Sequence, residues 1–195
     1  TEAHSERERA YAQVRDNGQI NMALCCDFLS RRLSLHTDVE QRYTFAERYA
    51  ELLQYHDASW INIWCATGAY YRALRGEAEE IPKILSQHRL STVNMLAPGK
   101  PMMEMIENQV YLAQGAYAKV VGRSAELLAV CEAMHYALVA LHIRIQTAAA
   151  YEKLGKTEEA RVWLRKALAD AEPDGFVMPF VENYDCLQTI LAREI

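Results

Sequence analysis

Small and large apolar residues recur at helical spacing from Ala148 onward, and this pattern predicts two antiparallel helices joined by a tight turn. Gly155 lies at the turn, and glycine is common directly after the end of a helix. Ala160 is one of the small residues placed where the two helices must approach closely, whereas the larger Tyr151 fills the space between them. Pro173 ends the unit, so the segment is typical of one helical hairpin of a repeat protein.

Glycines recur at a regular interval, which predicts further helix pairs. Gly76, Gly115 and Gly155 each separate two helical segments, and their spacing of about 40 residues lies among the periods of helical repeats. One further period back from Gly76 reaches the region of Thr37, where the segment Thr37–Glu40 has the pattern of a capping box at a helix start. Four turns at one period indicate a stack of helix pairs.

The predicted fold is all-α: a right-handed superhelix (α-solenoid) of antiparallel helix pairs, tetratricopeptide-like, with a repeat of about 40 residues. This repeat exceeds the tetratricopeptide unit of about 34 residues by about a turn and a half of helix. We expect residues 1–195 to form a single domain, because each pair buries its apolar face against the next. The expected elements are an opening helix over about 5–16, helix pairs over about 19–56, 58–89, 101–134 and 137–172, with irregular structure between 77 and 100, and a terminal helix over about 181–193.

Charge and cysteine content narrow the classes of function. The chain has 21 basic and 26 acidic residues and a formal charge of −5, whereas nucleic-acid-binding domains are usually basic. No run of about 18 apolar residues predicts a membrane span, and the charged start has no signal-peptide core. The five cysteines are scattered through apolar helical patterns, as is typical of reduced thiols. We therefore expect a cytoplasmic protein without membrane contact, and the missing initiator Met suggests a processed chain or a piece of a longer one.

Patterns that would carry catalysis or metal binding are weak. Cys131 and His135 are four residues apart on one helix, but zinc needs three or four ligands and no second close pair completes the set. Cys25 and Cys26 point about 100° apart on a helix, which favours packing over redox signalling. No Gly-flanked elbow exposes a serine, and the paired carboxylates lie at helix starts, where the helix dipole accounts for them. The sequence predicts no enzyme, no metal and no cofactor.

A candidate binding surface follows from the repeat itself. Positions thirteen, ten, six and three residues before each turn glycine line the groove of tetratricopeptide-like stacks, and here they form a mostly apolar wall with sparse polar groups. The predicted groove residues are Tyr70, Met105, Gln109, His142 and Glu152. This mixture suits a small amphipathic ligand or an apolar helix better than a polyanion. The alternative is that the longer helices close the groove and that these residues belong to the core.

The carboxyl-terminal portion resembles a known family. The segments that carry the resemblance are Gly115–Tyr117, Leu127–Leu128, Tyr151–Ala160, Leu164–Leu168 and Ala171–Val181. Over about residues 108–183, the chain is similar to the helical-repeat domain of LuxR-family transcriptional regulators of the MalT type. The segment Ala171–Val181 is the most specific part, because generic repeats have no such tail.

The resemblance implies a domain that follows a nucleotide-binding switch, precedes a helix-turn-helix, receives an inducer and controls self-association. No GxxxxGK(S/T) phosphate loop is present, so we expect neither ATP binding nor hydrolysis by this chain. No basic recognition helix follows residue 183, so contact with DNA would require a domain absent from this chain. The expected partners are a small-molecule inducer or a protein or peptide, and the chain is a candidate homo-oligomer. The alternative is a repeat scaffold that binds a peptide or protein without an inducer.

Overall fold

A computed structural model describes residues 2–16, 19–37, 45–54, 58–81 and 99–194, and every regular element within these ranges is a helix. The all-α expectation is therefore confirmed for this part of the chain. None of its helices is both long enough and apolar enough to cross a membrane. The helices group into two compact units, Thr1–Tyr71 and Arg72–Ile195, and the division falls within one helix. The single domain expected over residues 1–195 stays a prediction.

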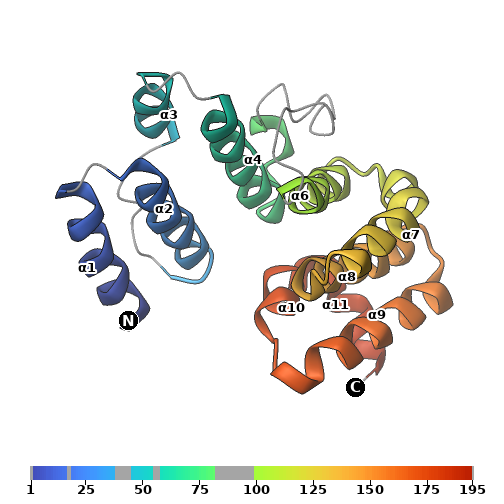
Figure 1. Cartoon of the computed structure of the whole chain (residues 1–195). Helices are drawn as coiled ribbons and strands as arrows, with labels where there is room; N and C mark the ends of the chain where they lie inside the picture. Colours follow the sequence, from blue (N-terminus) through green and yellow to red (C-terminus); the bar gives the residue numbers. More distant parts are fainter. Residues whose placement is uncertain (1, 17–18, 38–44, 55–57, 82–98, 195) are drawn as a thin grey trace. The chain divides into compact units, whose positions relative to one another are not determined.

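The first unit has an apolar core to which three helices contribute. Its helices are α1 (Glu2–Asp16), α2 (Ile20–Ser34), α3 (Phe45–Gln54) and all but the last turn of α4 (Ala58–Leu74). Leu24 from α2, Leu52 from α3 and Trp64 from α4 are fully buried together. α1 packs along α2, as Figure 1 shows in blue. The capping box predicted at 37–40 lies outside the described residues except for Thr37.

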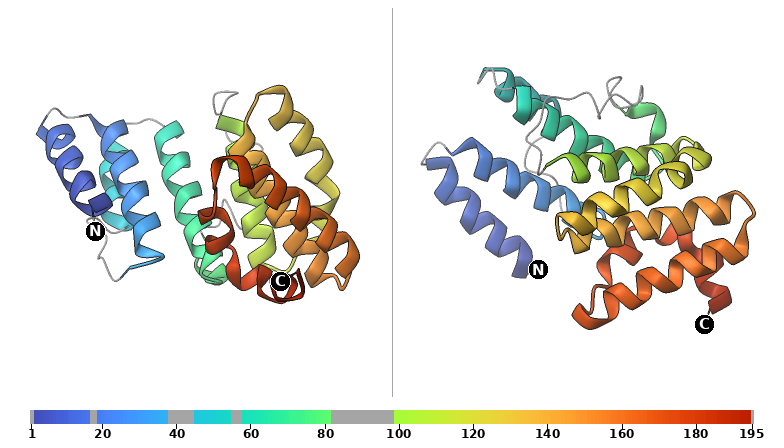
Figure 2. Two further views of the ribbon diagram at one scale, coloured as in Figure 1. Left: turned by 90° about the horizontal axis from the view of Figure 1, so that it is seen from below. Right: turned by 45° about the vertical axis from the view of Figure 1, so that its right-hand side comes forward.

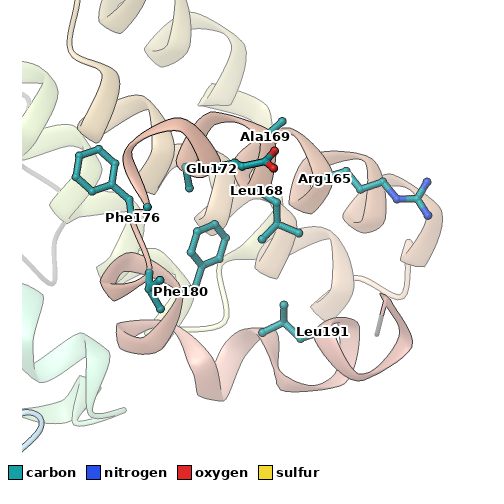
Figure 3. Close-up of a pocket in the computed structure, with 10 residues that line it drawn as sticks. Arg165, Leu168, Ala169, Glu172, Phe176, Phe180 and Leu191 are labelled. Carbon is teal, nitrogen blue, oxygen red and sulfur yellow. The ribbon is translucent and has the colours of Figure 1, made fainter.

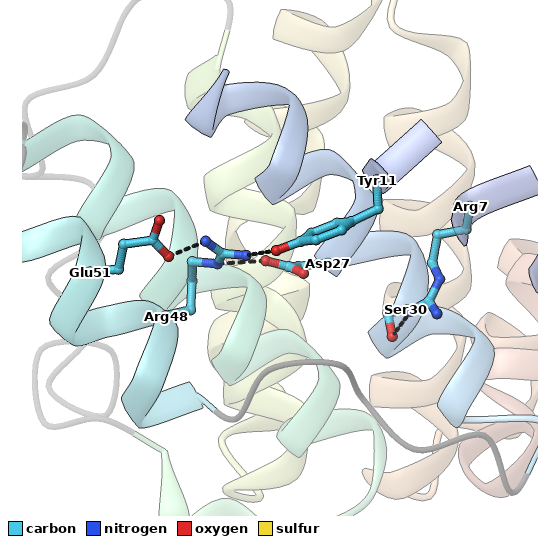
Figure 4. A network of polar contacts seen from close by, with 6 residues as sticks. All are labelled: Arg7, Tyr11, Asp27, Ser30, Arg48 and Glu51. Atoms are coloured by element: carbon cyan, nitrogen blue, oxygen red, sulfur yellow. Dashed lines mark hydrogen bonds and ion pairs between the residues drawn. The ribbon is translucent and has the colours of Figure 1, made fainter. Parts of the chain in front are cut away.

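A buried arginine links three helices of the first unit (Figure 4). Arg48 on α3 donates from Nε to Asp27 Oδ2 on α2 at 2.7 Å, and from Nη2 to the Tyr11 hydroxyl on α1 at 3.0 Å. It also pairs with Glu51 one turn further along α3. The Arg48 side chain is only 2% exposed, so these partners are what compensate the burial of its charge. Burial raises the pKa of Asp27, and the positive charge of Arg48 opposes this rise.

The second unit contains the helix pairs that the sequence predicts most clearly. Its elements after α4 are the 3₁₀ helix η1 (Ala78–Glu80), α6 (Lys100–Ala113), α7 (Tyr117–Ala133), α8 (Ala137–Lys153), α9 (Thr157–Ala171), the 3₁₀ helix η4 (Glu172–Asp174), α10 (Met178–Glu182) and α11 (Tyr184–Glu194). Of the second helix in the pair expected over 58–89, the described ranges contain only η1, because residues 82–98 lie outside them. The terminal helix expected over 181–193 is instead divided into α10 and α11 at Asn183, whose Nδ2 donates to the Pro179 carbonyl oxygen at 2.9 Å.

α8 is the central helix of the second unit. It packs against α6, α7, α9, α10 and α11, which surround it in Figures 1 and 2. All of its residues from Val139 to Ala150 are buried except Arg144. The fully buried Ala148 and Ala160 belong to the same core cluster, in agreement with the predicted close approach of α8 and α9. α8 is therefore buried around its whole circumference rather than along one stripe.

One type of turn follows successive helices of the second unit. At Gly155 the backbone has a φ of 73°, and the N–H of Lys156 donates to the Tyr151 carbonyl oxygen at 3.0 Å. This is a Schellman motif, in which glycine is favoured because a Cβ disfavours positive φ. Equivalent turns are centred on Gly76, Gly115, His135 and Gly175. From Gly115 onward they follow one another at half of the period found in the sequence.

Candidate functional site

The second unit contains a hollow with charged walls, the polar hollow, of about 460 Å³. This volume lies in the range of small-molecule binding sites. Its polar lining is contributed by Glu132, His135, Tyr136, Arg144, Asp170 and Asp174, and its apolar wall includes Leu141 and Phe176. The polar hollow thus gathers side chains from α7, α8, α9, η4 and the segment after η4.

The helix turns determine which side chains meet in the polar hollow. The Schellman turn at His135, where φ is 56°, places the last turn of α7 beside the first turn of α8. Arg144 on α8 forms an ion pair with Asp170 on α9, so one side of the hollow is fixed between these helices. The carboxylates of Glu132 and Asp174 have no hydrogen-bond or ion-pair partner within the described ranges. The hollow therefore presents two carboxylates that are available to a ligand.

The charged groups of the polar hollow determine which ligands it suits. Carboxylates only accept hydrogen bonds and a guanidinium only donates them, so the polar hollow suits a ligand with several donors and at least one acceptor. Cys131 lines the hollow but is only 1% exposed, and burial raises the pKa of its thiol. The negative charge of Glu104 adds to this rise, and Arg144 opposes it. The thiol is therefore protonated at neutral pH, which makes it a poor nucleophile.

A second hollow, the apolar hollow, has a volume of about 610 Å³ and lies between α9, α10 and α11 (Figure 3). Its walls include Leu168, Phe176, Val177, Phe180 and Leu191. In Figure 3 the side chains of Leu168, Phe180 and Leu191 are directed toward a common space, and the guanidinium of Arg165 extends away from it. Val177 is 64% exposed, which is high for a large apolar side chain beside a hollow.

The five predicted groove residues line neither of these hollows. Met105 and Gln109 on α6 and His142 on α8 are buried, with between 2% and 7% of their surface exposed. Gln146 on α8 brings the first two together, because its Nε2 donates to Gln109 Oε1 at 2.9 Å and to the Met105 carbonyl oxygen at 3.0 Å. These three predicted residues thus lie in the interior between α6 and α8.

The other two predicted groove residues have different surroundings. Tyr70 is buried and belongs to the first unit. Glu152, near the end of α8, accepts a hydrogen bond from Arg193 Nη1 on α11 at 3.0 Å, and its side chain is 10% exposed. Four of the five residues are buried, and Glu152 is partly buried. A binding role for them and the alternative, in which they belong to the core, both stay predictions.

Apart from Cys131 and His135, which were considered only as metal ligands, the sequence did not indicate the residues that line the two hollows as site residues. The tail Ala171–Val181 was singled out only for its resemblance to a family, yet its Phe176 lines both hollows and its Phe180 lines the apolar one. A signal was present, because the stretch directly after Gly175 reads Phe-Val-Met-Pro-Phe-Val, which is unusually apolar for a connection on the surface. His135 occupies a turn position that a glycine would have marked in the sequence.

The pair considered as metal ligands, Cys131 and His135, lies in the wall of the polar hollow. Within the residues that the structure describes, no group of three or more His, Cys, Asp or Glu side chains is arranged to hold a metal ion. The prediction that this protein has no metal was made from spacing alone and stays a prediction.

Comparison with known proteins gives no relative from which a function can be carried over. The chain matches no protein-family model, no curated protein and no solved structure. The function must therefore be inferred from the residues and the geometry of the second unit.

Proposed function

We propose that this chain is the effector-sensing and protein-interaction segment of a LuxR/MalT-type transcriptional regulator, and that an effector binds in the polar hollow. Two independent features, the family resemblance and the hollow, support the proposal. The tail Ala171–Val181, the most specific part of the resemblance, contributes Asp174 and Phe176 to the hollow. Binding of DNA and hydrolysis of ATP would lie outside this chain. Effector binding would control self-association.

We also propose that the helix pairs form a right-handed α-solenoid, with a repeat of about 40 residues as in other helical-repeat proteins. The proposal is supported by the turns at Gly115 and Gly155, which lie one such period apart and have φ values of 74° and 73°. Each turn joins the two helices of one pair, α6 with α7 and α8 with α9. Repeats of this kind usually present binding surfaces rather than catalytic centres.

The ligand class follows from the walls of the polar hollow. Glu132, Asp170 and Asp174 supply acceptors, Arg144 supplies donors, and Phe176 supplies an apolar surface. The single observation that carries the proposal is that these groups, from three helices and the tail, converge on one hollow of about 460 Å³. The preferred effector is a small amphipathic molecule rich in hydrogen-bond donors.

The proposed mechanism is a shift of population. Because the polar hollow spans α7, α8, α9 and the tail, a ligand that contacts all of them binds most tightly to one arrangement of these elements. The difference in affinity between two arrangements sets the limit on how far the ligand can shift their populations. Self-association would then respond to the arrangement that the ligand favours.

A thermal-melting screen of small metabolites tests the proposal. A true effector at about 100 times its Kd should stabilise the chain by about 2.7 kcal/mol. The double variant Glu132→Gln and Asp174→Asn should lose most of this stabilisation, because each substitution removes an ionised acceptor from the hollow. Glu126→Gln is the matched control, since Glu126 is an exposed carboxylate on α7 outside both hollows. Stabilisation that survives in the double variant would contradict binding in the polar hollow.

The second candidate is a repeat scaffold that binds a peptide or protein without an inducer. The exposed apolar side chains beside the apolar hollow favour it, because such patches often mark sites of protein interaction. The scaffold would gain support if no small molecule stabilised the chain while an apolar helical peptide did, in a manner abolished by Leu168→Asp. Stabilisation by a small molecule alone would count against it.

A further inference from the structure

An apolar face is formed by α9 and the tail, beside the apolar hollow. Its large side chains are between 39% and 64% exposed: Leu168, Phe176, Val177, Met178 and Val181. Four of them follow one another closely in the tail, and Leu168 lies on α9. An exposed apolar group of this kind on a folded chain marks a surface that another apolar surface can cover.

Two exposed residues of opposite charge lie beside this apolar face. Arg165 and Glu172 both line the apolar hollow, and both are exposed. They are seven residues apart, which is two helical turns or about 10 Å along the axis. Leu168 and Ala169 lie midway between them. Leu168 and Ala169 therefore lie between a positive and a negative side chain, and the apolar tail follows the negative one.

We propose that the apolar face is the contact between two copies of this chain, with the α9 helices antiparallel across a two-fold axis. A two-fold contact uses the same surface on both copies, so that surface must be complementary to itself. The arrangement of Arg165 and Glu172 meets this condition, because reversing the direction of α9 places each charge against its opposite.

The charge pairing fixes a register in which the apolar residues also match. When Arg165 faces Glu172 of the second copy, Leu168 faces Ala169 of the second copy, a large side chain against a small one. This register applies only to the helical residues, because α9 ends at Ala171 and the chain turns at Gly175, where φ is 63°. Val177 is 64% exposed and lines the apolar hollow, so a contact over this hollow would cover it.

A second copy explains these features better than a different partner. An unrelated helix would need its own pair of charges at the matching spacing, whereas a copy of this chain supplies them by symmetry. The inference rests on the proposed role in self-association, but the contact itself requires no effector. It assigns the interface to α9 and the tail.

Sedimentation equilibrium of the full chain tests the contact, together with two charge reversals. We expect a monomer–dimer equilibrium for the unmodified chain. Arg165→Glu and Glu172→Arg should each raise the dimer Kd at least about 10-fold, because each variant places like charges together twice across the axis. An equimolar mixture of the two variants should form a mixed dimer with one copy of each variant. In this dimer both pairs between positions 165 and 172 join opposite charges. Native mass spectrometry separates the mixed dimer from the homodimers by mass.

The mixed dimer requires a check of its own pairing. In it, the reversed Glu at position 165 of one copy faces the reversed Arg at position 172 of the other, and the second pair keeps its original charges. Both pairs are therefore attractive in the mixed dimer, whereas both pairs are repulsive in either homodimer. A parallel contact would instead place Arg165 of one copy against Arg165 of the other and would not give this pattern.

Two further variants keep the test decisive. Val177→Asp should weaken the dimer by introducing a charge into the apolar contact, and Glu126→Arg, a charge reversal on an exposed face of α7, should leave it unchanged. Circular dichroism and melting of every variant separate loss of contact from loss of fold. A monomer at all concentrations up to about 1 mM, or single reversals that do not complement each other when mixed, would overturn the inference. Failure of every small molecule to stabilise the chain would contradict the proposed effector site and leave this test unaffected.

Discussion

At Gly155 the backbone φ is 73°, and a Cβ placed there would meet no other heavy atom within 4 Å. Any cost of adding a side chain therefore comes from the backbone angle and not from crowding. Gly122 offers the opposite case on α7, because its surroundings are equally open but its φ lies outside the positive region. The two glycines separate the effect of backbone angle from the effect of space.

We expect Gly155→Ala to lower the free energy of unfolding by about 1 kcal/mol, since alanine is disfavoured at positive φ. Gly122→Ala should raise it by about 0.5–1 kcal/mol, because alanine stabilises the interior of a helix relative to glycine. Urea unfolding followed by circular dichroism measures both changes. Equal effects of the two substitutions would show that the turn at Gly155 does not constrain the residue.

His135 shows the limit of turn prediction at the scale of single residues. It adopts a φ of 56° in the same motif as the turn glycines, yet its side chain gives no turn signal in the sequence. The turn forms there because the flanking helices pack against each other, and that packing outweighs a modest backbone cost. Glycine positions were therefore predictable, whereas this equivalent position depended on tertiary contacts.

Among the helices, the pairing of α6 with α8 depends on a buried amide pair. Gln146 is fully buried, and its Nε2 reaches both Gln109 Oε1 and the Met105 carbonyl oxygen. A buried amide that lost its partner would remain without solvent, which costs about 1–3 kcal/mol. The amide pair thus favours one register between these two helices over others.

We expect Gln146→Ala and Gln109→Ala each to destabilise the chain by about 2 kcal/mol, from the lost hydrogen bond and the cavity left behind. The double variant should cost about 1 kcal/mol less than the two single costs together, because both remove the same bond. Chemical denaturation of all three variants gives the free energies needed for a double-mutant cycle. Gln188→Ala, at an exposed position on α11, is the control. Strictly additive costs would contradict a direct interaction.

In the first unit, the corresponding test concerns Arg48. Arg48→Met should destabilise the chain by about 3–5 kcal/mol, because the Asp27 carboxylate then stays buried without its guanidinium. Adding Asp27→Asn should recover part of this loss. A smaller or absent recovery would show that Arg48 acts mainly through Tyr11 and Glu51.

The same variant has an expected dependence on pH. Burial already raises the pKa of Asp27, and loss of the opposing charge of Arg48 should raise it further. The folded state then binds a proton more tightly than the unfolded chain, whose Asp pKa is about 3.9. The stability of Arg48→Met should therefore increase as the pH falls from about 7 toward 4, relative to the Arg48→Met and Asp27→Asn double variant. Melting curves across this pH range provide the measurement.

At the scale of the whole second unit, Phe176 connects the two hollows because it lines both of them. An effector that moves Phe176 from one side would change the surface offered to a second copy on the other side. We therefore expect an effector of the polar hollow to change the dimer Kd, and the dimer to change the effector affinity by the same factor. Phe176→Ala should abolish this coupling while leaving some binding of each partner, as sedimentation with and without effector would show. Coupling that persists in Phe176→Ala would require another route.

The order of helices was predictable from the sequence, but the candidate site was not. Glycines and apolar spacing indicated the pairs over 101–134 and 137–172, because local sequence determines where a helix ends. The predicted groove residues follow the geometry of shorter repeats, in which one face of the first helix stays open. Here α10 and α11 pack against α8, and Gln146 crosses to α6, so Gln109 and His142 are buried. Contacts made by a tail many residues away cannot be read from the spacing within one repeat.

The burial of α8 also determines how far the second unit must open before the backbone amides of this helix exchange with solvent. Its amide hydrogens reach solvent only when neighbours on every side move away, whereas α11 lies at the edge of the core. Hydrogen exchange at Ile143 to Ala150 should therefore require disruption of the whole unit, and exchange in α11 should proceed through smaller openings. The slowest-exchanging amides would mark α8 as the part of the chain in which order is lost last.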